Sequence, residues 1–144
     1  MATERRAEAV WQGDLLNGSG TIAQVPSGAF GPLDVSWASR AEEPNGKTSP
    51  EELIAAAWSA CFAMALSNVL AKAGNPPEKL ETSATVTFQP GEGITKGVLT
   101  VRGTVPGLDE SGFEAAANDA KVNCPVSQAL AGIPDVTLDA QLAS

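Results

Sequence analysis

The feature that most constrains the fold is an uncharged, apolar stretch from Leu53 to Ala71 that directly follows a strong helix start. Ser49 suits the N-cap position, Pro50 suits the first helical position, and Glu52 can complete a capping box. The predicted helix runs to about Lys72, where a glycine and then two prolines follow. Apolar side chains occur on every side of it: Leu53, Ile54, Ala57, Trp58, Cys61, Phe62, Met64 and Leu66. A helix that is apolar all round is expected at the centre of a fold, covered on several faces.

The same stretch approaches the length of a membrane span. It is rich in alanine and contains Ser59, Ser67 and Asn68, so a helix buried in a protein core explains it better. The N-terminus mixes charges of both signs and no apolar segment follows them, so we expect no signal peptide and a cytoplasmic location.

Short segments with strand character surround this helix. Strands are expected at residues 9–12, 21–25, 33–38, 83–88, 94–105 and 135–142, and a second helix at residues 111–122. Residues 15–20 suit a hairpin connection, Arg40 follows the third strand, and Pro125 either interrupts the second helix or starts a further helical turn. The order β-β-β-α-β-β-α-β predicts a single α+β domain over residues 1–144, with antiparallel sheet packed against two helices.

Composition excludes several classes of function. The 144 residues carry a net charge of −8, which argues against nucleic acid and anionic membranes, because both need a basic face. The chain has no histidine, which excludes Ser-His-Asp and Cys-His catalysis and histidine-bound zinc. Two cysteines, Cys61 and Cys124, are too few for a structural zinc or iron–sulfur site. We expect no metal and no cofactor, and the cysteines are either inert buried thiols or redox-active ones.

Four residues are candidates for chemistry, and each has a plain structural alternative. Cys61 could be a small core residue, since cysteine is among the most buried residue types. Cys124 precedes Pro125, so it would lie near the N-cap of a helical turn, whose N–H groups stabilise a thiolate; it could equally be a small residue at a helix break. Arg40 could be a solvated charge at a strand end, and Glu51 could serve only the helix dipole.

Two long motifs carry a resemblance to a known family. Residues 48–67 (TSPEELIAAAWSACFAMALS) are similar to the signature of the OsmC/Ohr superfamily, and residues 123–130 (NCPVSQAL) resemble its second cysteine motif. Residues 9–13 and 136–142 fit the same family, so the resemblance covers essentially the whole chain. It implies an OsmC-like fold, an intertwined homodimer with two antiparallel sheets packed around central helices.

The resemblance also implies an activity. Members of the superfamily are thiol-dependent peroxidases that act on hydroperoxides. Cys61 would be the peroxidatic thiol, and Cys124 would resolve its sulfenic acid as a disulfide. An external dithiol would then reduce the disulfide, so the expected partners are a hydroperoxide, a dithiol reductant and a second copy of the chain.

An arginine and a glutamate accompany the reactive thiol in this family. The glutamate falls on Glu51. No arginine lies between Arg6 and Arg40, and Arg40 precedes the loop to the central helix, as in the osmotically inducible branch; Arg5 and Arg6 are the alternatives. Glu51 lies ten residues before Cys61 on one predicted helix, roughly 15 Å along its axis. Glu51 would therefore serve the other subunit's thiol, and each active site would be shared.

Trp58 stands where this branch often has histidine, so any proton-handling role of that histidine does not carry over. Together with Phe62 and Met64, Trp58 predicts an apolar wall that favours a bulky organic hydroperoxide over hydrogen peroxide. The resemblance thus implies a peroxidase of oxidative or osmotic stress defence, and two alternatives to it remain. One is a redox-switched stress or sensor protein whose disulfide changes its shape or partners, and the other is an inert protein with two buried thiols.

Overall fold

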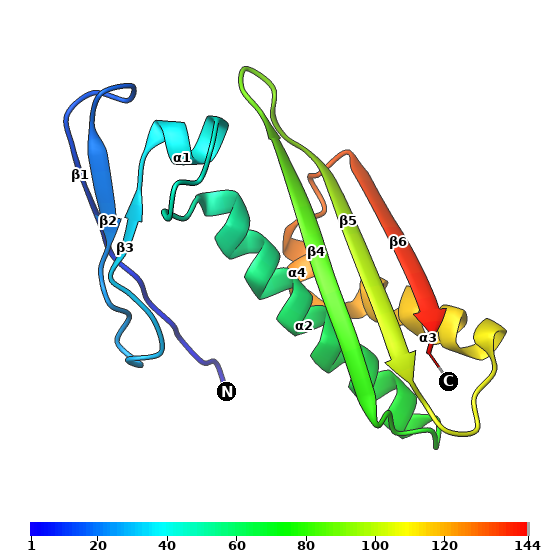
Figure 1. Cartoon of the computed structure of the whole chain (residues 1–144). Coiled ribbons are helices and arrows are strands. Elements are labelled where there is room, and N and C mark those ends of the chain that lie inside the picture. The colour runs from blue at the N-terminus through cyan, green and yellow to red at the C-terminus, as the bar shows by residue number, and fades with distance from the viewer. Residues whose placement is uncertain (144) are drawn as a thin grey trace. The chain divides into compact units, whose positions relative to one another are not determined.

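The structure, a computed structural model, describes residues 1–143 and divides into two compact units, residues 1–53 and residues from 54 onward. The first unit contains β1 (Ala9–Gln12), β2 (Ser19–Ile22), β3 (Leu33–Val35), α1 (Trp37–Ala41) and the first turn of α2 (Pro50–Lys72). The second contains the rest of α2, β4 (Lys79–Gln89), β5 (Gly93–Thr104), α3 (Glu110–Asn123), α4 (Pro125–Ala129) and β6 (Asp135–Leu142) (Figure 1). The predicted α+β class is confirmed, whereas the expectation that the whole chain acts as one domain stays a prediction.

The first unit is built on an antiparallel sheet in the order β1-β2-β3. The prediction that the third strand extends through residues 36–38 was wrong, because Ser36 starts α1 instead. Its side chain accepts the N–H of Ser39, and the Ser39 hydroxyl accepts the N–H of Ser36 in return. This reciprocal cap outweighs the alternating apolar pattern that favoured a strand. Arg40 consequently lies in the last turn of α1 rather than at a strand end.

The predicted long helix is confirmed as α2, with the predicted cap at its start. The Ser49 hydroxyl accepts the backbone N–H of Glu52 at 3.1 Å. The Glu52 carboxylate does not close a capping box with Ser49. It accepts a hydrogen bond from the Thr48 hydroxyl at 2.6 Å instead. Both carboxylates of the first turn also suit the positive end of the helix dipole.

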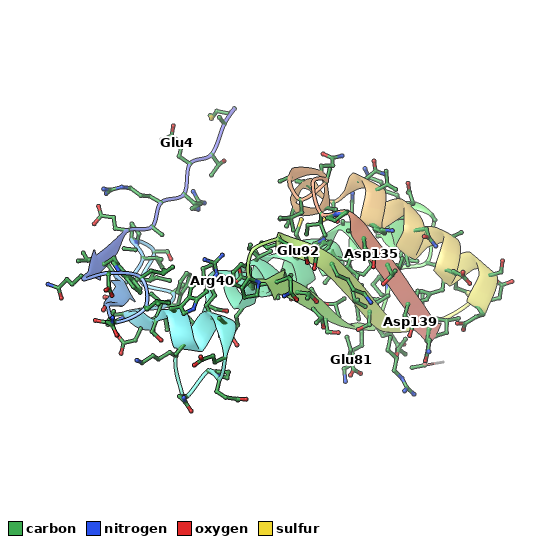
Figure 2. The ribbon with its side chains drawn as sticks, turned by 90° about the horizontal axis from the view of Figure 1, so that it is seen from above. Glu4, Arg40, Glu81, Glu92, Asp135 and Asp139 are labelled. Atoms are coloured by element: carbon green, nitrogen blue, oxygen red, sulfur yellow. The ribbon has the colours of Figure 1, made fainter. Side chains whose placement is uncertain are left out.

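The second unit holds a three-stranded sheet in the order β4-β5-β6. β4 and β5 are antiparallel, but β6 runs parallel to β5, so the expectation of a purely antiparallel sheet was wrong here. The reason is that α3 and α4 form a crossover between β5 and β6. This crossover returns the chain to the end of the sheet at which β5 begins, so β6 runs in the same direction as β5. Figure 1 shows α2, α3 and α4 on one face of this sheet. The other face is polar, with Glu81, Asp135 and Asp139 exposed on β4 and β6 (Figure 2).

α2 buries one stripe of side chains and leaves another open. The buried stripe repeats every four residues and consists of Trp58, Phe62, Leu66 and Leu70. Ala57, Ala60 and Met64 are exposed, and 22% of the most apolar 18-residue stretch is buried within the chain. Among the described residues α2 is the one helix that could also cross a membrane by length and composition. The expectation that it is covered on several faces is therefore not met within a single chain.

Two glycines of β5 receive aromatic rings from the helices. A Cβ atom added at Gly97 would lie 2.5 Å from the Trp58 ring, and one added at Gly103 would lie 2.5 Å from the Phe113 ring. Both distances are far below van der Waals contact, so each ring rests directly on strand backbone. These two contacts fix where α2 and α3 pack on the sheet.

Candidate functional site

The two cysteines lie together in the second unit. The Cys124 Sγ donates a hydrogen bond to the Cys61 Sγ, and the two sulfurs are 2.8 Å apart. Both thiols are free; Cys124 is fully buried and Cys61 is half-buried. A disulfide has a sulfur–sulfur distance of roughly 2.05 Å, so a small side-chain adjustment would allow the bond to form. The structure thus brings together the two residues whose pairing the family resemblance implied.

The short helix α4 explains how Cys124 reaches Cys61. Cys124 is both the C-cap of α3 and the N-cap of α4, with Pro125 at the first position of α4. Its N–H donates to the Ala120 carbonyl, and its own carbonyl accepts the N–H of Gln128. The backbone N–H of Val126, in the first turn of α4, lies close enough to the Cys61 thiol to lower its pKa. The predicted N-cap position of Cys124 is therefore confirmed.

The surroundings of Cys61 favour its protonated form. Burial raises the pKa of the Cys61 thiol above its ordinary value, and the hydrogen bond shared with Cys124 raises that pKa further. The Val126 amide lowers the Cys61 pKa, but not enough to reverse the first two effects. These effects keep Cys61 protonated in the resting protein. Formation of the Cys61 thiolate therefore needs a further positive group that lowers its pKa.

Arg40 and Glu51 form an ion pair in the first unit. Arg40 Nε lies 3.0 Å from Glu51 Oε1, and an Arg40 terminal nitrogen lies 2.9 Å from Glu51 Oε2. The Arg40 side chain is 32% exposed and that of Glu51 is 8% exposed. This two-point contact between a planar guanidinium and a buried carboxylate fixes the direction in which Arg40 points. The structure brings these two predicted residues together as well.

An apolar pocket of about 370 Å³ adjoins Arg40 within the first unit. Its wall consists of Trp11, Leu15, Val35, Ser36, Trp37, Arg40 and Pro50. The sequence patterns did not indicate the two tryptophans as site residues, because Trp11 lay in a predicted strand that also fits the family and Trp37 lay in a predicted strand. Trp11 is 41% exposed, but exposure cannot be read from the sequence, so no local signal identified Trp11.

The predicted apolar wall does not form one surface within the chain. Trp58 and Phe62 lie in the core, whereas Met64 is 74% exposed. Trp58 uses its polar atom inside the protein, since its Nε1 donates to the Ser127 hydroxyl at 2.7 Å. Ser127 was not among the predicted site residues, because it lies 69 residues from Trp58 and no local sequence signal marks it. Contact between these three residues and a substrate stays a prediction.

The described residues contain no cluster of three or more His, Cys, Asp or Glu side chains that could hold a metal ion.

The comparisons with known proteins find OsmC-like and organic hydroperoxide resistance proteins. The sequence profile of a family described as OsmC-like protein matches residues 43–139. Peroxiredoxin OsmC from Escherichia coli (strain K12) is 41% identical over 147 aligned residues, which cover 100% of both chains. The organic hydroperoxide resistance protein OhrA of Bacillus subtilis (strain 168) is 36% identical over 69% of this chain and 72% of its own length. The crystal structure of the organic hydroperoxide resistance protein OhrB of Bacillus subtilis has a TM-score of 0.68 at 26% identity, covering 94% of this chain and 97% of that one.

Proposed function

Because the chain belongs to the OsmC-like protein family, we propose that it is a thiol peroxidase that reduces organic hydroperoxides in stress defence. The observation that carries the proposal is the pair of free thiols, Cys61 and Cys124, at 2.8 Å. Such a pair can give up two electrons to a peroxide as it forms a disulfide, and it can regain them from an external dithiol. We also infer a cytosolic location, where cellular reductants keep such thiols reduced.

The reaction has two chemical steps before reduction. The Cys61 thiolate attacks the peroxide: an S–O bond forms as the O–O bond breaks, the sulfur is oxidised to a sulfenic acid, and the alkoxide takes a proton and leaves as the alcohol. The Cys124 thiol then attacks the Cys61 sulfur, forming the S–S bond as the S–O bond breaks and water leaves. An external dithiol returns both cysteines to thiols and becomes a disulfide itself.

The first step needs a cation near Cys61. A thiol with an ordinary pKa is only about 3% ionised at pH 7, and burial raises the pKa of Cys61. A guanidinium within about 4–6 Å would lower that pKa by roughly 1–3 units. It would also stabilise charge on the departing alkoxide. Arg40 is our candidate, held in one direction by Glu51.

The Arg40–Glu51 pair would come from a second copy of the chain. Ten residues separate Glu51 from Cys61 on α2, which is roughly 15 Å along the helix axis. No glutamate side chain spans that length. The exposed apolar stripe of α2, with Ala57, Ala60 and Met64, supports a second copy as its cover. We therefore propose a homodimer in which each site combines the cysteines of one subunit with the ion pair of its partner.

The pocket beside Arg40 is a suitable place for the organic group of the substrate. Trp11, Leu15 and Trp37 would cover that group while the guanidinium binds the peroxide oxygens. Each Å² of apolar surface buried in this way contributes roughly 25 cal/mol, a gain that hydrogen peroxide cannot have. In the proposed dimer, Met64 of the subunit that supplies the cysteines, exposed on α2, would complete the wall, and Trp58 and Phe62 of that same subunit would hold its α2 against its own sheet.

Single-turnover kinetics of two variants test the reaction. Cys61→Ser should consume no peroxide. Cys124→Ser should complete one stoichiometric turnover and stop, leaving a sulfenic acid that dimedone traps. The wild type should turn over repeatedly with a dithiol and should show a higher kcat/KM for cumene hydroperoxide than for hydrogen peroxide. A wild-type protein that forms the disulfide once but does not cycle with any dithiol would instead be a redox switch.

Mixing of subunits tests the shared site. Homodimers of Cys61→Ser and of Glu51→Ala should each be impaired. A heterodimer refolded from both contains one site in which the cysteine and the glutamate are intact. Activity of the mixture should therefore exceed that of either parent. If heterodimers form and activity does not rise, the shared site is wrong.

A further inference from the structure

Trp58 joins the two elements that carry the cysteines. It lies three residues before Cys61 on α2, and its Nε1 donates to the hydroxyl of Ser127 at 2.7 Å. Ser127 lies three residues after Cys124, within α4. The hydrogen bond therefore connects α2 to α4 about one helical turn from each sulfur.

The indole is fixed at its other edge as well. Its ring carbons Cζ3 and Cη2 lie where a Cβ atom of Gly97 would stand, at 2.5 and 2.6 Å from that position. The side chain is only 1% exposed. A flat ring held by strand backbone on one edge and by a hydroxyl at its N–H cannot turn without losing one of the two contacts. The direction of the Trp58 N–H, and with it the position of Ser127, is therefore set by the core.

α4 needs such an anchor because it is short. It has five residues, and an isolated helix of this length does not hold its own geometry in water. Its N-terminal end nevertheless supplies two groups to Cys61: the Cys124 sulfur at 2.8 Å and the backbone N–H of Val126. Val126 directly precedes Ser127, so a displacement of Ser127 moves both groups.

We propose that Trp58 and Ser127 are a positioning pair whose hydrogen bond holds α4 so that Cys124 and the Val126 amide both face Cys61. The pair thereby sets the rate at which the Cys61 sulfenic acid reacts with Cys124 to form the disulfide and water. This step rests on the proposed peroxidase function, whereas the placement of the two thiols does not.

Ser127→Ala is the direct test, and the surroundings make it a mild change. A cavity of about 440 Å³ is lined by both Trp58 and Ser127, so water can reach the indole N–H once the hydroxyl is gone. The neighbouring Gln128→Ala is the matched control, because it removes a side-chain hydrogen bond from α4 to the Val122 carbonyl of α3 and not to α2. Ser127→Thr keeps the hydroxyl and serves as the rescue.

Two measurements report on the pair. After one equivalent of peroxide, Ser127→Ala should form the disulfide about tenfold more slowly or worse, and more sulfenic acid should be trapped by dimedone. In a Cys124→Ser background, the midpoint pH of Cys61 alkylation should rise, because a displaced Val126 amide stabilises the thiolate less. Gln128→Ala and Ser127→Thr should stay within about twofold of the wild type, a difference of less than 1 kcal/mol in barrier. A purely structural role of Ser127 would not move the alkylation midpoint.

Several results would overturn the proposal. Wild-type disulfide rate and alkylation midpoint in Ser127→Ala would do so, as would equal defects in Gln128→Ala or no rescue by threonine. If Ser127→Ala does not fold, Trp58→Phe removes the N–H while keeping a ring, and the same two changes are expected. Oxidation by diamide and alkylation need no peroxidase activity. They therefore still test the pair if the wild type fails to consume peroxide.

Discussion

Oxidation of Cys61 and Cys124 to a disulfide should stabilise the fold, and the size of the effect follows from their positions. The two residues are 63 apart in sequence, so the bond closes a long loop that joins α2 to the N-cap of α4. Loop-closure entropy for that length predicts that the free energy of unfolding rises by about 4 kcal/mol on oxidation. By linkage, the reduction potential of the folded protein should be lower than that of its unfolded chain by about 90 mV, since roughly 30 mV corresponds to 1.4 kcal/mol.

Thermal unfolding at one protein concentration checks this prediction. Wild type oxidised with one equivalent of diamide is compared with wild type kept reduced by a phosphine. Each kcal/mol shifts Tm by roughly 2–8 °C for domains in this size range, so Tm should rise by about 8 °C or more. Cys124→Ser, treated in the same two ways, should show no such difference. An oxidised protein that melts at or below the temperature of the reduced one would refute the reasoning, because strain in the native state would then cancel the entropic gain.

Three further predictions concern other parts of the molecule. Because the fold raises the pKa of Cys61, the free energy of unfolding of the reduced protein should fall as pH rises above the ordinary thiol pKa of about 8.5 and through the folded pKa. Urea unfolding from pH 7 to 10 measures this change, and a stability that does not vary with pH would contradict it. Gly97→Ala should lower stability by roughly 1–3 kcal/mol, because its methyl group meets the Trp58 ring; calorimetry measures the loss, and a neutral result would show that the indole can move away. Arg40→Met and Glu51→Gln should show a coupling of about 1–3 kcal/mol in a double-mutant cycle of unfolding, whereas additive effects would mean that the ion pair contributes nothing.

The elements that sequence predicted well are those with strong local signals. α2 has a serine cap, a proline at its first position and a glycine after its end, and all of these act within a few residues. α1 was missed because its reciprocal Ser36–Ser39 cap occupies only one turn inside an alternating apolar pattern. The direction of β6 was missed for a different reason. Side chains alternate with the same period in parallel and antiparallel strands, so the pattern of Val136, Leu138 and Ala140 carries no information on direction.

In the candidate site, too, the sequence indicated what depends on local signals and did not indicate what depends on contacts between distant residues. Each cysteine could be identified as a candidate, but nothing in their spacing placed them 2.8 Å apart; that expectation came from the resemblance alone. The Arg40–Glu51 pair joins residues eleven apart across a helix start, and it too was expected only from the family. Ser127 could not be identified from the sequence, for a physical reason. Its role depends on a single long-range hydrogen bond, and a serine in the first turn of a helix is ordinary without it.

The two glycines of β5 have a consequence for how this sequence can change over time. Position 97 can gain a side chain only if position 58 loses its large ring. In the same way, position 103 can gain a side chain only if position 113 loses its ring. Substitutions at each pair are therefore expected to arise together in related chains, although the partners are far apart in sequence. Position 127 should covary with positions 58 and 97. A residue at position 58 without a side-chain N–H would no longer need a hydroxyl group at position 127.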